Sequence, residues 1–394
     1  MKKKSSLIAV LLCVTMLVGC GGAVNEPAQP AQTPAEEGTE AESPEAAEET
    51  PAAQESDQTA EAPAASNVPA DKVVKIAFTD APTLSVGAME IYHPSYAAML
   101  AFKGSFEKST SGEYAVELYP NGTLGDAASP LEQMLTGTIQ GSTPADGALS
   151  AFAPDIQAFS IPYLFSEGTV AYDVLDGEYG KDLVDKIAAE SGLRIIASYD
   201  NGGFRHFTNS KKEIKTAADM EGLNIRVQDS PVYLKLVESM GASATPVAFL
   251  ELYSALQTGV VDGQENSAVT TLGASLNEVQ SYCTLDGHLL GLAFLTVSED
   301  WYQSLDAETQ KKVDIAGREA SIAARGTCRY AESIAINTLS EKGVQVYSPN
   351  AEELATFKVS QEPVIEYLKS EIDPESVDNL LKAVEKSEAA IMGK

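Results

Sequence analysis

One long helical pattern near the C-terminus constrains this fold more than any other feature of the sequence. Asp306 can cap a helix, and residues 307–342 then continue without a single Pro until Gly343. At 1.5 Å per residue, about 36 helical residues span roughly 54 Å, more than the diameter of one small domain. We therefore expect a helix that packs against two lobes rather than one.

Short strand and helix patterns alternate in the part of the chain that precedes this helix. Residues 72–78, 114–119 and 193–198 read as strands, whereas residues 96–108 and 179–190 read as amphipathic helices. Alternation at such short intervals predicts an α/β architecture with a largely parallel sheet. Two further helical patterns, at 351–368 and 374–392, close the chain.

The segment 221–241 contains the clearest candidate for a binding site. Residues 223–227 alternate as a strand, with Arg226 on the face opposite the apolar residues. Asp229 or Ser230 can cap the helix that follows, and Gly241 is a plausible end for it. Arg226 therefore lies near the carboxyl end of a strand and beside a helix N-terminus. Open α/β sheets bind ligands at this place, and both groups favour an anion.

The N-terminus has the pattern of an export signal. Three Lys precede a 12-residue apolar stretch, which is too short to span a bilayer, and the stretch ends in Leu17-Val18-Gly19-Cys20. This ending resembles the bacterial lipobox. We expect a signal peptide at 1–19 and lipidation of Cys20, which would anchor the protein by acyl chains on the outer face of the cell membrane, at the cell surface or in the periplasm.

Residues 20–70 read as a disordered acidic tether. Ten Glu and one Asp occur there without any Lys or Arg, and aromatic residues are absent. The formal net charge of the whole chain is −30. Because the first four residues contribute three Lys and the tether contributes −11, residues 71–394 carry −22. Such an acidic surface argues against nucleic acid as a partner.

Motifs for catalysis, cofactors or metals are absent from the sequence. No nucleotide-binding glycine loop and no nucleophile elbow occurs, and none of the three His has metal-ligand spacing. We therefore expect no cofactor, no metal and no catalytic residue. Cys283 and Cys328 are the two Cys beyond the N-terminal region, and we expect them to be free thiols.

Several segments resemble the DctP-type solute-binding proteins of tripartite ATP-independent periplasmic (TRAP) transporters. They include LYPNGTLG at 118–125, APDIQAFSIPYLF at 153–165, GGFRHFTN at 202–209, NIRV at 224–227 and ALQTGVVDGQEN at 255–266. These segments follow the order and spacing of the family through most of residues 71–340. The last string is the most specific of them.

The resemblance implies a two-lobed periplasmic-binding-protein-like α/β fold with hinge strands and one long helix that spans both lobes. Lobe I would comprise residues 71–202 with 292–331, and lobe II residues 203–291 with 332–394. The lobes would close by hinge motion on an organic acid, and the protein would deliver this acid to the membrane permease subunits of a transporter driven by an ion gradient. It would perform no chemistry, and we expect a monomer.

The site residues carry over from the motifs one at a time. Arg226 matches the arginine that clamps the ligand carboxylate, since a guanidinium offers two parallel donors. Arg205 matches a second, assisting arginine, and Asn266 matches an amide that bonds the ligand. Glu265 would hold an arginine or a ligand hydroxyl, and Phe249 would form an apolar wall.

Two carboxylates depart from the pattern of the family. Asp229 follows Arg226 by three residues, where relatives tend to have an amide, and Asp146 stands in for a site carboxylate by approximate position. An acid in the site would repel a second carboxylate or accept a hydrogen bond from a ligand hydroxyl or amine.

Three other functions stay open from the sequence alone. The same fold could serve as a sensory receptor that signals to a membrane kinase. Abundant carboxylates leave room for a surface hydrolase. Asp229 and Asp146 also keep open the binding of an uncharged or basic solute.

Overall fold

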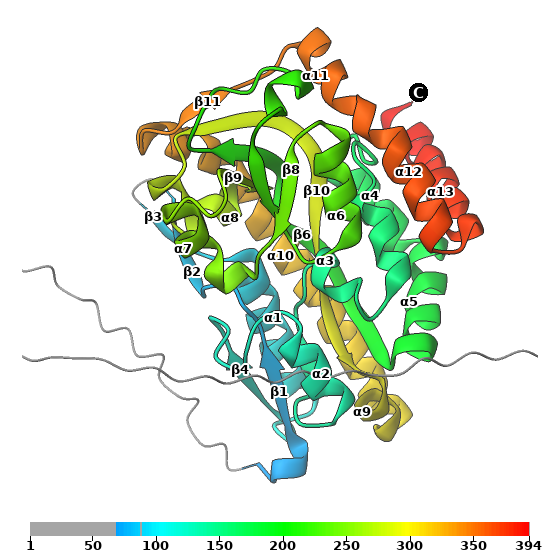
Figure 1. Cartoon of the computed structure of the whole chain (residues 1–394). Helices are drawn as coiled ribbons and strands as arrows, with labels where there is room; N and C mark the ends of the chain where they lie inside the picture. Colours follow the sequence, from blue (N-terminus) through cyan, green and yellow to red (C-terminus); the bar gives the residue numbers. More distant parts are fainter. Residues whose placement is uncertain (1–67, 87–88, 394) are drawn as a thin grey trace, which may run out of the picture. The chain divides into compact units, whose positions relative to one another are not determined.

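The structure is a computed structural model that describes residues 68–86 and 89–393 (Figure 1). The predicted signal peptide, the lipidation of Cys20 and nearly all of the predicted tether lie outside these residues. All of the described residues belong to one compact unit. The division into two lobes at the predicted boundaries therefore stays a prediction.

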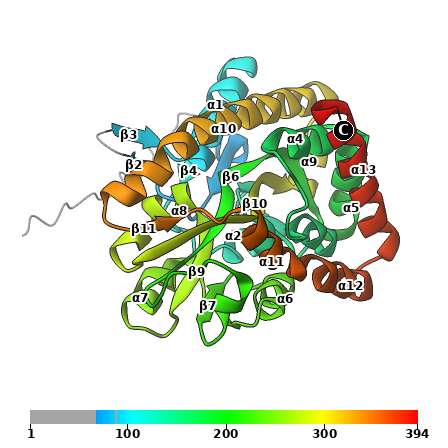
Figure 2. The same cartoon turned by 90° about the horizontal axis from the view of Figure 1, so that it is seen from above.

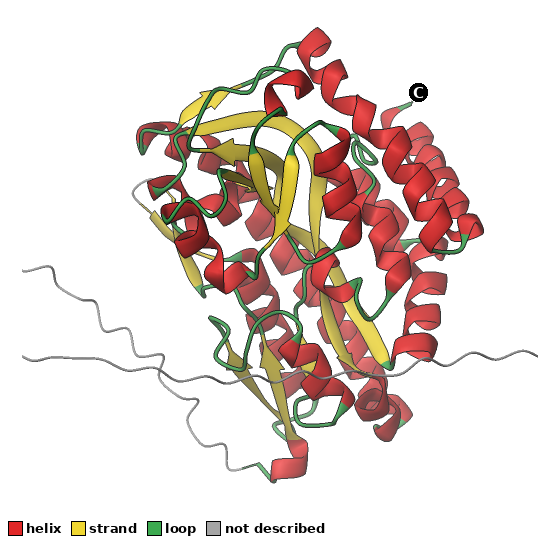
Figure 3. Ribbon diagram, in the orientation of Figure 1, coloured by secondary structure: helices red, strands yellow, loops and turns green. Residues whose placement is uncertain are grey.

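A nine-stranded mixed sheet forms the centre of the described part of the chain (Figure 3). Its order is β4-β1-β5-β10-β6-β9-β7-β8, and β11 pairs with β10. The strands are β1 Val73–Ala77, β4 Ala115–Tyr119, β5 Gly141–Ser142, β6 Leu193–Asn209, β7 Asn224–Val227, β8 Ser243–Pro246, β9 Gly263–Ser267, β10 Tyr282–Ser298 and β11 Gln345–Tyr347. A separate hairpin joins β2 Thr83–Val86 to β3 Met89–Tyr92.

Two long strands join the two ends of the sheet. β6 and β10 have 17 residues each and run antiparallel to one another. β5 pairs with the last residues of β10, and β9 pairs with the last residues of β6, so the two ends are attached to opposite ends of the same strand pair. We call β4, β1 and β5 the β1 group, and β9, β7 and β8 the β9 group.

The expectation of a largely parallel sheet is correct within each group and wrong at the centre. β1 pairs in parallel with β4 and β5, and β7 does so with β8 and β9. The pairs β5–β10, β10–β6 and β6–β9 are antiparallel. The reason is that β6 crosses from one group to the other and β10 crosses back, so the two connections run in opposite directions.

Helices cover both groups. They are α1 Pro94–Ser109, α2 Ser129–Leu135, α3 Asp146–Leu149, α4 Gly168–Asp176, α5 Glu178–Ser191, α6 Pro231–Ser239, α7 Leu252–Gln257, α8 Ala268–Gly273, α9 Glu299–Ser304, α10 Ala307–Glu341, α11 Ala351–Phe357, α12 Gln361–Glu371 and α13 Pro374–Met392. Short 3-10 turns connect several of them. Figure 1 shows α12 and α13 on the same side of the molecule as α4 and α5; α13 contacts α4 and α5, and α12 contacts α13 and α6.

The predicted long helix is confirmed as α10. Asp306 caps it by accepting hydrogen bonds from the backbone N–H groups of Glu308 and Thr309 (2.9 and 3.0 Å). Its 35 residues extend about 53 Å. The helix packs on α1 beside the β1 group, on the central strand β6, and on α8 and β11 at the other end (Figure 2). It therefore spans both groups, as its length requires.

The helical pattern at 351–368 is interrupted, contrary to expectation. α11 ends at Phe357, a 3-10 turn occupies Lys358–Ser360, and α12 begins at Gln361. Pro363 lies in the first turn of α12, where a backbone N–H would have no partner within the helix, so its absence loses no hydrogen bond. In one uninterrupted helix from 351 to 368, the Pro363 ring would clash with the backbone carbonyl four residues earlier.

Among the described residues, no helix has both the length and the hydropathy that crossing a bilayer requires. Cys283 and Cys328 are buried free thiols, as expected.

Candidate functional site

A small cavity lies between the two groups, where the carboxyl ends of β1 and β7 approach the crossing strand β6. Its volume is about 60 Å³. From the β1 side it is lined by Thr79, Asp80, Thr143, Ala145 and Asn201. From the β9 side it is lined by Arg205, Arg226, Gln228, Phe249, Asn266 and Thr270. Ligands of open α/β sheets bind at such strand ends.

Arg226 offers unused hydrogen-bond donors to this cavity. Its side chain is buried, and Nε donates to the backbone carbonyl of Val247 (2.8 Å). No carboxylate of the described residues pairs with it, and its two Nη groups have no partner there. Burial lowers the pKa of Arg226 to about 10, so it stays cationic at neutral pH. A buried guanidinium without a counter-ion is suited to receive one from a ligand.

Arg205 lines the same cavity, but its charge is already compensated. Nε and Nη2 donate to the two carboxylate oxygens of Glu265 (2.5 and 2.8 Å), and Nη2 also reaches the Glu265 carbonyl. Both side chains are buried. Although burial alone would raise the pKa of Glu265, the Arg205 charge and the His288 hydrogen bond lower it to about 2. This pair is therefore ionised at physiological pH.

A buried histidine, His288, contacts the carboxylate of Glu265. His288 Nε2 lies 3.4 Å from Glu265 Oε2, and Nδ1 lies 2.8 Å from Asp286 Oδ2. Burial opposes protonation, yet the two carboxylates raise the pKa of His288 to about 9. The imidazole therefore carries a proton at neutral pH, and the four side chains alternate in charge from Asp286 through His288 and Glu265 to Arg205.

Asn266 and Phe249 also face the cavity, as the sequence predicts. Asn266 Nδ2 donates to Gln264 Oε1, which fixes the amide and leaves its oxygen available. Phe249 lies in a 3-10 turn, Phe249–Glu251, and is half-buried. It lines this cavity and a neighbouring one.

Two predicted residues lie apart from the lining. Asp146 is buried, and its oxygens accept from Gly147 N, Ser160 Oγ and Tyr233 Oη (2.9, 3.1 and 2.9 Å). Burial raises the pKa of Asp146, against the attraction of Arg205. Asp229 is exposed beyond the end of β7. The structure thus brings Arg226, Arg205, Asn266 and Phe249 together around the cavity, and Glu265 contacts Arg205. Asp146 and Asp229 are not among the residues that line the cavity.

Sequence reasoning missed Thr79, Asp80, Thr143, Asn201, Gln228 and Thr270, which line the cavity. A signal for some of them was present. Thr79 and Asp80 follow β1 closely, and Gln228 follows β7 directly, which are the strand ends where ligands bind. Asn201 had no such signal, because it lies inside β6, eight residues after that strand begins.

A second cavity of about 160 Å³ continues from the first. The two share four lining residues: Thr79, Asp80, Phe249 and Thr270. His93, Asn121 and Leu250 line only the second one. His93 caps α1 by accepting from Ser95 N (3.3 Å), so its ring is fixed beside Asp80. Both arginines line only the smaller of the two connected cavities.

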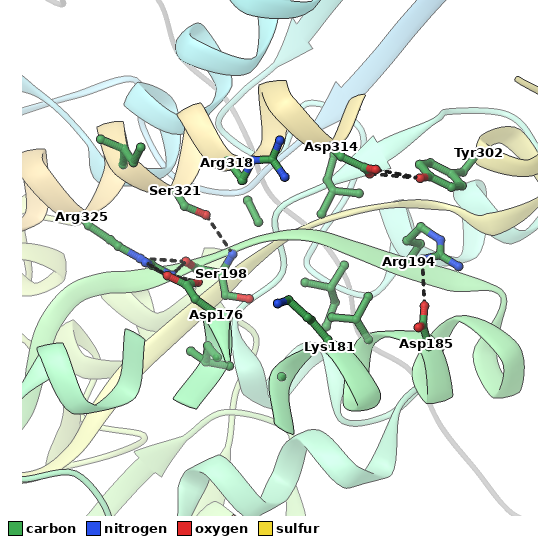
Figure 4. A pocket seen from close by; sticks show the side chains of 17 residues that line it. Asp176, Lys181, Asp185, Arg194, Ser198, Tyr302, Asp314, Arg318, Ser321 and Arg325 are labelled. Carbon is green, nitrogen blue, oxygen red and sulfur yellow. Dashed lines mark hydrogen bonds and ion pairs between the residues drawn. The ribbon is translucent and has the colours of Figure 1, made fainter. Parts of the chain in front are cut away.

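A wider groove lies on the other side of β6, between α5 and α10, with a volume of about 450 Å³ (Figure 4). Two of the four cations that line it form ion pairs within the protein, whereas Lys181 and Arg318 have no ion-pair partner among the described residues. Arg325 pairs with Asp176 and donates to the Ser198 carbonyl, and Arg194 pairs with Glu299 and Asp185. These ion pairs tie the helices to β6, so we assign Arg194 and Arg325 a structural role.

The described residues include no group of three or more His, Cys, Asp or Glu side chains that could hold a metal ion. The cavity combines the free guanidinium of Arg226, the compensated Arg205, the carboxylate of Asp80 and several neutral polar groups. Arg226 is the group in this lining that suits the binding of an anion.

Residues 88–371 match the family model DctP, described as bacterial extracellular solute-binding protein, family 7. The chain belongs to this family. The C4-dicarboxylate-binding periplasmic protein of Rhodobacter capsulatus is 31% identical over 282 residues, which cover 70% of this chain and 83% of that protein.

Solved structures agree with the family assignment. The sugar acid binding protein of Advenella mimigardefordensis strain DPN7T, solved in complex with galactonate, is 29% identical to this chain and has a TM-score of 0.74. The match covers 80% of this chain and 98% of that protein chain. A TRAP periplasmic solute-binding protein from Sulfitobacter sp. NAS-14.1 with bound β-D-galacturonate is 28% identical to this chain, with a TM-score of 0.73. That match covers 80% of this chain and 100% of the other chain.

This DctP family member has the two-lobed α/β fold that the sequence predicts. It is a solute-binding protein of the TRAP type and not an enzyme, which rules out the hydrolase alternative. β6 and β10 cross between the β1 group and the β9 group, and α10 contacts elements beside both.

Proposed function

We propose that this protein captures an organic acid between its two lobes and delivers it to a TRAP-type permease. The observation that carries the proposal is Arg226, which lines the cavity, is buried, and has no carboxylate partner among the described residues. Leaving such a charge uncompensated is costly, and a ligand carboxylate would satisfy it with two parallel hydrogen bonds.

The surroundings support an acid as the ligand. Arg205 adds positive potential while Glu265 keeps it in place, and Asn266 supplies an amide. Several relatives are described by the acids that they bind, including C4-dicarboxylate, galactonate and galacturonate. Because residues 71–394 carry −22, capture depends on these local donors and not on the overall field of the protein.

Thermal unfolding of the purified protein against a panel of organic acids, sugars, amino acids and polyamines tests the proposal. A ligand at 100 times its Kd adds about 2.7 kcal/mol of stability, which raises Tm measurably. We expect shifts from carboxylates only, and loss of the shift in Arg226→Ala. Shifts only from neutral or basic solutes would contradict the carboxylate assignment and favour the alternative of a non-carboxylate ligand.

Transport and sensing differ in their membrane partner. We propose the permease as the partner because the relatives of known type are transporter components. Cells that express the protein together with the membrane subunits of a TRAP-type permease should accumulate the radiolabelled acid, and deletion of the binding protein should abolish uptake. Unchanged uptake together with an altered transcriptional response to the acid would instead support a receptor role.

We further propose that Cys20 is the lipidated residue, so that the protein is held at the outer face of the cell membrane. The support is the ending Leu17-Val18-Gly19-Cys20 directly after the apolar stretch. In fractionated cells the wild-type protein should sediment with membranes, and Cys20→Ser should appear in the soluble extracytoplasmic fraction. Cys13→Ser is the matched control and should leave the protein in the membrane fraction.

A further inference from the structure

The cavity offers a charge balance that suits a single carboxylate. Arg205 is compensated by Glu265, so Arg226 is the uncompensated arginine among the residues that line the two cavities. The same lining contains one carboxylate, that of Asp80. One ligand carboxylate can therefore pair with Arg226, whereas a second one finds no free guanidinium in this lining and meets the carboxylate of Asp80.

Unpartnered polar atoms show what else the ligand contains. Thr143 Oγ1, Asn201 Oδ1 and Gln228 Nε2 are fully buried, lack a hydrogen-bond partner among the described residues, and belong to residues that line the cavity with Arg226. Buried polar groups are nearly always paired in native proteins. Hydroxyl groups both donate and accept, so a ligand with several hydroxyls can satisfy an amide oxygen, an amide N–H and a threonine together.

Asp80 is placed where the ligand extends away from the arginines. It lines both cavities, whereas Arg226 lines only the smaller one. Its Oδ2 accepts from Ser95 Oγ (2.9 Å), and Ser95 is itself fully buried in the first turn of α1. Its Oδ1 accepts no hydrogen bond from the described residues, and the side chain retains 10% exposure. One oxygen is thus anchored, and the other is left without a hydrogen-bond partner among the described residues.

We infer that the solute is a hydroxylated acid with one carboxylate, and that Asp80 selects it by accepting hydrogen bonds from hydroxyls remote from the carboxylate and by repelling a second carboxylate there. This inference rests on the proposed function and narrows its substrate class. It makes Asp80 a specificity-determining residue, in addition to the arginine that binds the carboxylate. Like charges held close together in a partly desolvated cleft repel strongly, so the discrimination is expected to be large.

Matched pairs of ligands test the inference on the wild-type protein without any variant. Each pair has the same carbon chain and configuration and differs by a terminal CH₂OH or carboxylate: gluconate and glucarate, galactonate and galactarate, erythronate and meso-tartrate. Calorimetry should find binding of at least one monocarboxylate, with its dicarboxylate partner at least 100-fold weaker. Equal or tighter binding of the dicarboxylate would overturn the inference while leaving the proposed function intact.

The Asp80→Asn variant tests whether Asp80 causes the preference for monocarboxylates over dicarboxylates. The amide keeps an acceptor for Ser95 and loses the charge, so the preference for the monocarboxylate should fall at least tenfold. Asp71→Asn, at an exposed position, is the control and should leave the affinities for the monocarboxylate and the dicarboxylate unchanged. A full preference retained in a folded Asp80→Asn protein would overturn the role of Asp80. If no acid of any kind binds and Arg226→Ala changes nothing, the proposed function itself fails.

Discussion

Arg205 and Glu265 form a buried, two-pronged ion pair behind the cavity, whereas Arg226 faces the same cavity with no carboxylate beside it. The two arginines therefore have different roles although both line the same cavity, Arg205 from β6 and Arg226 from β7. Arg205 is part of the structure and supplies positive potential. Arg226 is the group whose charge the ligand completes, and the predictions below depend on this difference.

Removing the free guanidinium should abolish most of the binding. In Arg226→Ala the ligand carboxylate loses both donors in a desolvated site, which costs roughly 2–5 kcal/mol of binding free energy. Arg226→Lys should recover only part of it, because an ammonium cannot form two parallel hydrogen bonds. Isothermal titration with the best acid from the panel measures both, and Lys211→Ala, at an exposed position, serves as control. Equal affinity of the Ala variant would rule out the clamp.

Breaking the buried pair should affect folding first. Glu265→Gln leaves the Arg205 charge uncompensated at a fully buried position, which should lower the free energy of unfolding by about 3–5 kcal/mol. The double variant Arg205→Met with Glu265→Leu removes both charges and should regain much of that loss. Urea unfolding measures each value. Additive losses in the double variant would mean that the two side chains do not act as a pair.

The hydroxyl of Tyr233 should matter although it does not line the cavity. It donates to Asp146 Oδ2 (2.9 Å) and so connects α6 with the start of α3. Tyr233→Phe leaves a buried carboxylate short of one donor and should destabilise the protein by about 1–3 kcal/mol, as measured by denaturant unfolding. Tyr330→Phe, on an exposed part of α10, is the comparison and should change stability little.

Two buried histidines should shape the pH dependence of stability in opposite directions. The pKa of His288 is raised to about 9, so its contribution is complete below about pH 6.5 and is lost as the pH rises through 9. Burial lowers the pKa of His206 to about 4, so the unfolded chain takes up a proton first and stability falls as the pH drops from about 6.5 to 4.

Thermal unfolding between pH 4 and pH 10 separates these two effects. His288→Gln should flatten the alkaline side of the profile, and His206→Gln the acidic side. Other groups that titrate in this range remain in both variants, so each serves as the control for the other. A His288→Gln profile that still falls with the wild-type slope between pH 6.5 and 9 would mean that this imidazole is neutral in the folded protein.

Several elements could be predicted because local physics decides them. The run 307–342 has a cap at Asp306, no Pro and a closing Gly343, and the helix follows those signals closely. The segment 223–241 likewise gives a strand, a turn and a helix at the expected places, with Gly241 at φ +86°. Ser230 takes the expected cap position, but its hydroxyl contacts Ser150 instead of capping the helix.

Other elements depend on contacts that a local pattern does not contain. β6 was expected to end at Ser198, yet it continues to Asn209 through Asp200, Asn201 and Arg205. Those polar residues interrupt the alternation of a strand. They are tolerated because β9 and β10 satisfy the backbone on both sides and because side chains such as Glu265 compensate the buried charge.

The sequence by itself determined the α/β class, the helix that spans both lobes and, through motif resemblance, the family and Arg226. Residue type and spacing are enough for these, since they record local propensity and shared ancestry. Only the tertiary structure decided which charges are free. Arg205 and Arg226 look equivalent along the chain, and Asp146, Asp229 and Asp80 look like interchangeable acids. Folding buries Asp146 among three donors, leaves Asp229 in solvent and directs Asp80 to the cavity, because charge compensation depends on neighbours that are distant in sequence.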